Sequence, residues 1–211
     1  MEIEILYEDK NIAVVNKPKG LIVHATVDKK RENLFDLLKN RYQTYLGLIH
    51  RLDKDTSGAM IFSLNEKINS ILDQGMKEHS FEKKYWAIVK GKLEIDEKVE
   101  IFLKKIQNKK KQDIMIKVEK GGVKAITFLK TLKSNSDYSL IECTLHTGRM
   151  HQIRATLLSL GHPILGDKLY GEIEGDRLFL HSRYLKISLD GTDIEVTAPI
   201  DETFQKVIDQ L

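Results

Sequence analysis

The chain has 211 residues, of which 41% are hydrophobic, and a formal net charge of +3 at neutral pH. This apolar content is sufficient for a buried core, and we expect one catalytic domain over residues 1–211. A single cysteine excludes a disulfide framework, so Cys143 is expected in the core. The N-terminal residues alternate between apolar and charged types and no long apolar stretch is present, which argues against a signal peptide or membrane span and favours the cytoplasm.

Hydrophobic periodicity predicts more strands than helices. Alternating or continuous apolar runs predict strands near residues 3–5, 12–15, 59–64, 85–89, 125–132, 138–145, 178–189 and 193–197. Apolar residues at helical spacing predict helices over about residues 33–42, after the N-cap Asn65, over 151–160, and after Asp201. Because strands predominate and their connections are short, we predict an α+β fold with a mixed, largely antiparallel sheet and flanking helices.

Residues 92–125 combine alternating apolar positions with many lysines and end at Gly121-Gly122, which predicts a β-excursion with a basic tip. From Lys104 to Lys124 there are eight lysines against Asp113 and Glu119, a local excess of six positive charges in a chain whose total is only three. Such a concentrated patch is suited to phosphates. A solvated hairpin without a partner is the alternative.

The run from His50 to Gly58 places Asp53 beside cationic and turn-forming residues at the entrance to the buried strand over 59–64. A carboxylate serves as a nucleophile when its environment fixes its charge, and a nearby arginine keeps it ionised. We therefore interpret the run as a nucleophile loop. An ordinary solvated Asp/Ser/Gly turn has the same composition and is the alternative.

A second polar-rich block follows about a hundred residues later. It reads Leu145-His-Thr-Gly-Arg-Met-His-Gln-Ile-Arg154 and continues to Gly161-His-Pro-Ile-Leu-Gly-Asp167. Together with His50-Arg-Leu-Asp53, this block resembles the RluA-type pseudouridine synthases. Val14–Gly20 and Lys84–Ala87 extend the resemblance over nearly the whole chain, with Ala59 replacing the usual leucine. The first expected strand begins near residue 3, so we expect a catalytic domain without the S4-like domain of several relatives.

The resemblance implies a long bent sheet with a cleft across its middle, and isomerisation of uridine to pseudouridine in tRNA, large-subunit rRNA, or both. It implies that Asp53 either attacks C1′ or assists a glycal route, and that Arg154 pairs with Asp53. Tyr85 would stack on the base and act as general base, and Leu180 would supply an apolar contact. From the residues alone, Arg154 has the alternative of a surface arginine, and Tyr85 and Leu180 have that of packing residues.

Chemistry on a stacked nucleotide requires that the base be flipped out, and similar enzymes insert an arginine at the position of Arg51 into the vacated stack. A planar guanidinium can stack as well as bind phosphate, although a surface pair of Arg51 with Asp55 is the alternative. The residues expected to contact RNA are His50, Arg51, Thr56, Lys109, Lys110, Lys111, Arg149, His151, Gln152 and Leu180.

No cofactor and no metal are expected. His146 and His151 are five residues apart, without a carboxylate at ligand spacing, so the histidines are expected to bind backbone groups or RNA. No glycine-rich phosphate loop is present. A monomer would suffice.

Two other functions fit parts of the pattern. A nucleosidase-type glycoside hydrolase would need a second carboxylate, and Asp55 is too close in sequence to Asp53 to serve reliably. A non-catalytic RNA-binding or ribosome-assembly factor is disfavoured by the intact Asp53, Tyr85 and Arg154. The sequence does not indicate which uridine is modified.

Overall fold

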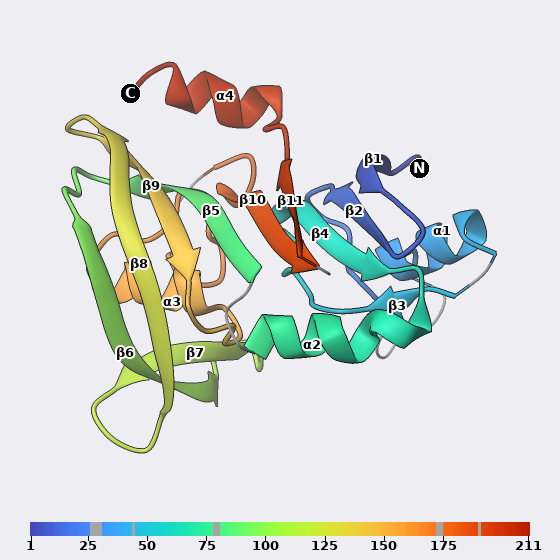
Figure 1. Cartoon of the computed structure of the whole chain (residues 1–211). Coiled ribbons are helices and arrows are strands. Elements are labelled where there is room, and N and C mark those ends of the chain that lie inside the picture. Colours follow the sequence, from blue (N-terminus) through green and yellow to red (C-terminus); the bar gives the residue numbers. More distant parts are fainter. Residues whose placement is uncertain (26–30, 44, 78–80, 172–174, 190) are drawn as a thin grey trace. The chain divides into compact units, whose positions relative to one another are not determined.

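The computed structural model describes residues 1–25, 31–43, 45–77, 81–171, 175–189 and 191–211 (Figure 1). The chain forms two compact units, residues 1–83 with 181–200 and residues 84–180 with 201–211. The prediction of one catalytic domain over the whole chain stays a prediction. No helix in the described part of the chain is long and apolar enough to cross a membrane.

The first unit is built on a sheet. Its strands are β1 (Glu4–Glu8), β2 (Ile12–Lys17), β3 (Gly47–Leu48), β4 (Ser57–Ser63), β10 (Leu180–Leu189) from its second residue onward, and β11 (Thr192–Thr197). The order is β1-β2-β4-β10, with β3 beside β4 and β11 beside β10. β10 runs parallel to β4, whereas the pairs β1–β2, β2–β4, β3–β4 and β10–β11 are antiparallel.

Strand β4 explains where the core of this unit lies. Every residue of β4 is buried, as expected for a continuous apolar run with neighbours on both edges. The short helix η1 (Glu66–Ile68) and the helix α2 (Asn69–Lys77) contribute Ile68 and Leu72 to a cluster that includes Ile12 and Ile61 of the sheet. The sheet is therefore covered by η1 and α2 on one face, where their apolar residues pack against β2 and β4.

The helix starts follow the capping residues. Helix α1 (Leu34–Arg41) begins after Asn33, whose side chain accepts a hydrogen bond from the Asp36 N–H. Asn65 caps in the same way, accepting from the Lys67 N–H, which confirms its predicted role. The first turn after Asn65 is a 3₁₀ helix, however, and the α-helix starts only at Asn69.

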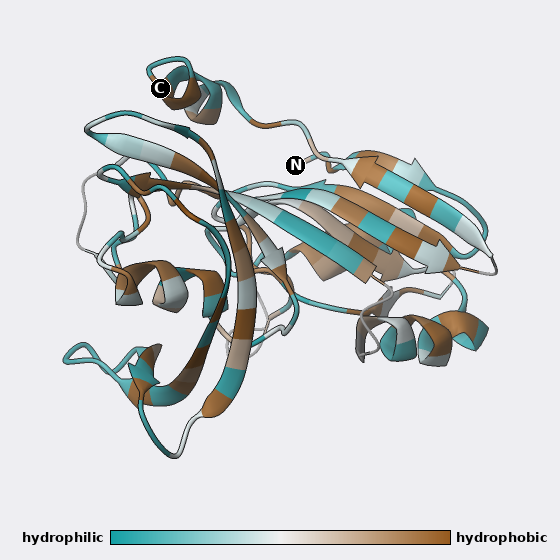
Figure 2. Ribbon diagram, turned by 60° about the vertical axis from the view of Figure 1, so that its left-hand side comes forward, coloured by the Kyte–Doolittle hydropathy of each residue, from teal (hydrophilic) through white to brown (hydrophobic). Residues whose placement is uncertain are grey.

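The second unit is a sheet in the order β5-β9-β8-β6-β7. Its strands are β5 (Phe81–Lys90) from Lys84 onward, β6 (Asp96–Gln107), β7 (Asp113–Val118), β8 (Val123–Ser134) and β9 (Tyr138–Leu145), all antiparallel to their neighbours. Its helices are α3 (Gln152–Ser159) and α4 (Glu202–Ile208). Ala155 of α3 packs in a cluster with Ile101, Leu103, Met115 and Ala125. Figure 2 shows the alternation of hydrophobic and hydrophilic residues along the long strands.

The predicted class is confirmed: the fold is α+β, with a mixed and largely antiparallel sheet. The segment predicted as a β-excursion consists of β6, β7 and the start of β8. The β6–β7 turn is organised by Asn108, whose Oδ1 accepts from the backbone N–H groups of Lys110 and Gln112 at 2.9 and 3.0 Å. The turn therefore presents Lys109, Lys110 and Lys111 at its tip, and all three are exposed.

Candidate active site

Asp53 lies in the loop that leads into β4. Residues 50–53 have no regular secondary structure, and a turn at Lys54 and Asp55 follows. The Asp53 carbonyl accepts a hydrogen bond from the Thr56 N–H at 3.2 Å, which closes this turn. Asp53 is half-buried, whereas Thr56 is 2% exposed and lies inside the fold. The carboxylate is thus carried by a short loop with a fixed exit into a buried strand, which supports precise positioning.

A buried lysine holds the same loop from the other side. Lys17, at the end of β2, is fully buried. Its Nζ donates to the backbone carbonyls of Pro18 (2.9 Å), Leu21 (2.7 Å) and Lys54 (2.9 Å). An ammonium group is rarely buried unless its donors are satisfied, and these three carbonyls satisfy it. Lys17 therefore ties the turn after β2 to the residue next to Asp53, a role that the sequence analysis missed.

The exit of the loop depends on a close approach of two strands. Gly58 has a φ of +111°, and an added Cβ would lie 2.7 Å from the backbone nitrogen of Ser182 in β10. Next to it, the Ser57 hydroxyl lies 2.8 Å from Nδ1 of His181. His181 Nε2 lies 3.3 Å from the Ala198 carbonyl, which can only accept, so Nε2 carries the hydrogen and Ser57 donates to Nδ1. These buried contacts clamp β4 onto β10.

The His50 side chain is hydrogen-bonded to the backbone of β4. Its Nε2 accepts a hydrogen bond from the Ile61 N–H at 3.2 Å, which requires that this nitrogen be unprotonated. Burial, and then the nearby positive charge of Lys83, lower the pKa of His50 to about 3. His50 is therefore neutral at physiological pH and braces the loop, as expected for a histidine bound to the backbone. Its contact with RNA stays a prediction.

Arg51 is exposed. Within the described residues it makes no ion pair with Asp55, the alternative raised by the sequence. Its guanidinium is therefore on the surface of the first unit, two residues before Asp53. This placement suits a side chain that reaches bound RNA, and its contact with RNA stays a prediction.

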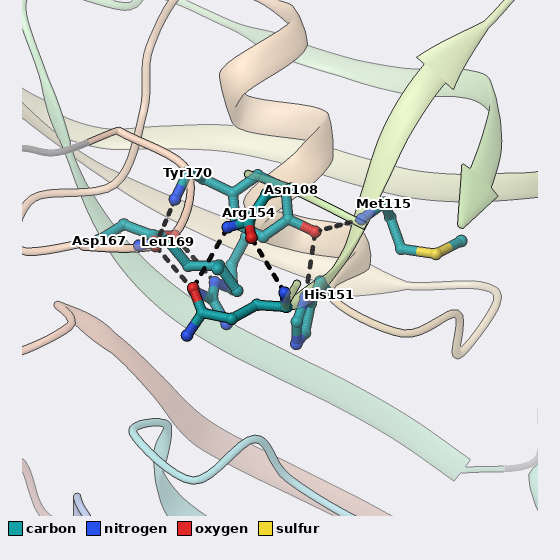
Figure 3. Close-up of polar contacts among 8 residues, drawn as sticks. Asn108, Met115, His151, Arg154, Asp167, Leu169 and Tyr170 are labelled. Atoms are coloured by element: carbon teal, nitrogen blue, oxygen red, sulfur yellow. Dashed lines mark hydrogen bonds and ion pairs between the residues drawn. The ribbon is translucent and has the colours of Figure 1, made fainter. Parts of the chain in front are cut away.

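Arg154 is the best-anchored arginine of the second unit. It occupies the first turn of α3, as predicted, and is 8% exposed. Its Nε and Nη2 donate to Oδ2 and Oδ1 of Asp167 at 2.8 and 2.7 Å, a bidentate pair, and its guanidinium carbon lies 4.9 Å from the centre of the Tyr170 ring (Figure 3). The sequence analysis predicted a pairing with Asp53 from resemblance and missed Asp167. Asp167 ends the Gly161–Asp167 motif given above, and this motif was the sequence signal that could have identified it as the partner of Arg154.

The loop before α3 is held by Gln152. Its Oε1 accepts from the Thr147 hydroxyl at 2.7 Å and the Arg149 N–H at 3.0 Å, and its Nε2 donates to the Ile126 carbonyl at 2.9 Å and to Thr127 Oγ1 at 2.8 Å. All four hydrogen-bonding positions of the amide are thus used inside the fold. Gln152 positions Arg149, whose exposed side chain also donates from Nε to the Lys124 carbonyl at 3.0 Å. The predicted contact of Gln152 with RNA stays a prediction.

The two remaining positions implied by resemblance are both buried in the second unit. Tyr85 is 6% exposed and lies opposite Cys143 of β9, and Leu180 is 4% exposed at the start of β10. Cys143 is itself fully buried, as predicted, and burial raises the pKa of its thiol. Tyr85 and Leu180 are therefore buried in the fold, and their roles toward a base stay predictions.

The lysines of the excursion differ in their pairing. Lys105 pairs with Asp113 at 2.6 Å and Lys124 with Glu100 at 2.6 Å, which neutralises those two charges. Lys109, Lys110 and Lys111 make no ion pair with any described residue. The tip of the excursion therefore carries three adjacent lysines whose charges are not paired with a described carboxylate.

The predicted residues thus fall into two groups. The first unit brings together His50, Arg51, Asp53 and Thr56 with the buried Lys17. The second unit carries Tyr85, Lys109, Lys110, Lys111, Arg149, His151, Gln152, Arg154 and Leu180. Chemically, the first group presents a carboxylate in a braced loop, and the second presents a fixed guanidinium and a basic turn suited to polyanions.

Comparisons with known proteins identify the family of the chain. The family model described as RNA pseudouridylate synthase matches residues 11–159. The tRNA pseudouridine synthase C of Haemophilus ducreyi is 33% identical over 239 aligned positions, covering 100% of this chain and 96% of that protein. The ribosomal large subunit pseudouridine synthase D of Borreliella burgdorferi is 34% identical over 89% of this chain and 61% of its own length.

A solved structure extends the likeness to the fold. Human RNA pseudouridylate synthase domain containing 4 superposes with a TM-score of 0.78 at 26% identity, covering 99% of this chain and 92% of that one. The family model covers most of the chain, including the runs His50–Asp53 and Leu145–Arg154, and the first relative matches over nearly its whole length. The chain therefore belongs to the RNA pseudouridylate synthase family, in its RluA branch, and is an isomerase.

Proposed function

We propose that the protein isomerises specific uridines to pseudouridine in tRNA, large-subunit rRNA, or both, with Asp53 as the nucleophile. The observation that carries the proposal is the braced loop around Asp53. The Thr56 N–H closes the loop at 3.2 Å, and Lys17 Nζ binds the Lys54 carbonyl at 2.9 Å. The substrate classes come from the relatives, one named for tRNA and one for the ribosomal large subunit.

The reaction is an internal exchange of bonds. The bond from N1 of uracil to C1′ of ribose breaks, the detached uracil turns, and a bond from C5 to C1′ forms. The proton leaves C5 and N1 gains one, so the atoms balance and no energy source or redox partner is required. In this proposal Asp53 either bonds to C1′ or assists loss of a ribose proton to give a glycal, with Asp53 or Tyr85 as the base.

The remaining residues have separate proposed roles. Arg154 would keep Asp53 anionic. Asp167 accepts from two of the five N–H groups of this arginine, and this bidentate pair fixes the plane of the guanidinium. Tyr85 and Leu180 would supply the walls that exclude water from the intermediate. Arg51, exposed beside the loop, would fill the base stack after the target uridine is flipped out.

The test is release of tritium from C5-labelled uridine in bulk cellular RNA, with transfer and ribosomal fractions assayed separately. We expect release by the wild type and none by Asp53→Asn. The matched control is Asp55→Asn, which removes an exposed carboxylate from the same loop and should retain release.

Each outcome is informative. Release by the wild type from one fraction assigns the RNA class. Release by Asp53→Asn at the wild-type rate would overturn the nucleophile assignment. RNA binding without release from either fraction would instead favour a binding or ribosome-assembly role. Liberation of free uracil that keeps its C5 tritium, from nucleosides, would favour a nucleosidase.

A further inference from the structure

Tyr170 joins three parts of the second unit. It lies three residues after Asp167, in the turn that follows Gly166. Its hydroxyl oxygen accepts a hydrogen bond from the Met115 N–H of β7 at 2.6 Å and lies 3.0 Å from Nδ1 of His151 at the start of α3 (Figure 3). The face of its ring lies against the Arg154 guanidinium at 4.9 Å. A single side chain therefore contacts the excursion, the loop before α3 and the anchored arginine.

Asp167 fixes the ring and the guanidinium together. Its Oδ1 accepts from Arg154 Nη2 at 2.7 Å and from the backbone N–H groups of Leu169 and Tyr170 at 3.0 and 3.1 Å. The carboxylate that holds the arginine thus also holds the backbone of the tyrosine that stacks on it. Because Asp167 is 1% exposed, these charge-assisted bonds are shielded from water and define one relative placement.

The hydrogen bond with Met115 connects the Asp167–Arg154–Tyr170 cluster to the turn that carries Lys109, Lys110 and Lys111. β7 is at the end of the strand order in its unit, with β6 as its neighbour in the sheet. The N–H groups on the outer edge of such a strand have no partner strand, and Tyr170 supplies an oxygen for one of them. β7 begins directly after the turn that carries Lys109, Lys110 and Lys111. The hydroxyl of Tyr170 therefore fixes the position of that turn relative to the start of helix α3.

The hydroxyl also orients His151. Its oxygen accepts from the Met115 N–H, and its hydrogen can be donated to His151 Nδ1 in the tautomer that carries the imidazole proton on Nε2. The His151 and Tyr170 rings meet edge to face, with centroids 5.5 Å apart at 84°. His151 has a left-handed φ of 51°, so its backbone depends on such support from its side chain.

We propose that Tyr170 is a positioning residue with two separable actions. Its hydroxyl places the basic turn, and hence RNA held by that turn, relative to α3. Its ring holds the Arg154 guanidinium in the orientation used in the reaction. The second action rests on the proposed function, whereas the first requires only that RNA binds the basic turn.

The two actions are tested with two substitutions. Tyr170→Phe removes the hydroxyl and keeps the ring, so we expect KM for RNA to rise about tenfold while kcat stays within about twofold. Tyr170→Leu removes both, so we expect the same rise in KM and a fall in kcat of at least about tenfold. The matched control is Tyr138→Phe in β9 of the same unit, a tyrosine that is partly exposed like Tyr170, and it should change neither value.

Two physical readouts accompany the kinetics. In Tyr170→Phe the Met115 amide should exchange with solvent faster, and the nitrogen chemical shifts of His151 should show loss of the single tautomer. The circular dichroism of each variant reports whether it folds. If Tyr170→Leu does not fold, Tyr170→Phe still tests the action of the hydroxyl.

The outcomes that contradict the proposal are distinct. An unchanged KM and unchanged Met115 exchange in Tyr170→Phe would overturn the hydroxyl action. A folded Tyr170→Leu with wild-type kcat would overturn the ring action. If the wild type binds RNA but releases no tritium, the proposed function fails, and the Tyr170 proposal is then decided by the RNA Kd of the Phe variant and by Met115 exchange.

Discussion

At the scale of single residues, Gly58 sets the distance between two strands. Its φ of +111° disfavours any side chain, and an added Cβ would also collide with the backbone of Ser182. Gly58→Ala should therefore lower the free energy of unfolding by about 2–5 kcal/mol, measured by urea denaturation. Gly20→Ala is the control, because Gly20 has a φ of +80° with no neighbour within 4 Å of an added Cβ. It should cost only about 1–2 kcal/mol, and equal costs would exclude the close approach as the cause.

His50 predicts a dependence of stability on pH. Its pKa in the folded chain is lowered from 6.5 to about 3, mainly by burial and then by Lys83. A histidine with a depressed folded pKa contributes stability above the unfolded value, and that contribution is lost as the pH falls from 6.5 toward 3. Between pH 6.5 and pH 5 the loss should be about 2 kcal/mol.

The substitution that tests this effect is His50→Gln, whose amide oxygen can still accept the Ile61 N–H but does not titrate. The difference in unfolding free energy between wild type and His50→Gln should therefore shift by about 2 kcal/mol over that interval. The matched control is His146→Gln, which makes the same change at an exposed histidine. Parallel profiles for wild type and His50→Gln would contradict the lowered pKa.

At the scale of elements, the β6–β7 turn is the part of the second unit best suited to phosphates. Lys109, Lys110 and Lys111 are exposed and make no ion pair with a described residue. Replacing all three with glutamate should weaken RNA binding and reduce the slope of log K against log salt by roughly two to three, because each phosphate contact releases a counterion. The Kd is measured by fluorescence anisotropy over a series of KCl concentrations.

The control for that prediction makes the same change in net charge at three lysines outside the excursion. Lys10, Lys67 and Lys206 are exposed and lie outside the excursion. Their triple substitution by glutamate should alter the slope much less. Equal slopes for the two triple variants would mean that net charge, and not the turn, governs binding.

At the scale of the whole molecule, charge is distributed unevenly. The chain has a net charge of +3, whereas Lys104 to Lys124 carries an excess of six, so the rest of the chain has a net charge of 3 − 6 = −3. RNA should therefore be drawn to the excursion and not uniformly to the surface. Under the proposed function, RNA binding and chemistry should then depend on different parts of the chain.

This separation gives a prediction for Asp53→Asn. The variant should lose turnover while its RNA Kd stays within a few-fold of the wild type and its salt slope is unchanged, because the phosphate contacts remain. Anisotropy titrations and tritium release on the same preparation measure both. A large loss of affinity would show that Asp53 supports RNA binding through the structure of its loop.

Much of the fold follows from local sequence. The strand predicted over 138–145 coincides with β9, and Asn33, Asn65 and Asp201 cap the helices that follow them, because a short polar side chain can satisfy the first N–H groups of a helix. The α+β class follows from the same periodicity. The 3₁₀ turn at Glu66–Ile68 was not predicted, since 3₁₀ and α-helical turns share one capping signal.

The sequence by itself determined the family, the carboxylate and the basic segment, because these are encoded in contiguous motifs and in local charge. Only the tertiary structure decided which partners hold them. Lys17 is buried on the Lys54 carbonyl, Arg154 is locked on Asp167, and Tyr170 bonds the Met115 N–H. The two residues of these contacts are 37, 13 and 55 positions apart in the sequence, respectively. No local pattern specifies such a pairing, because it depends on how strands and turns are brought together by packing.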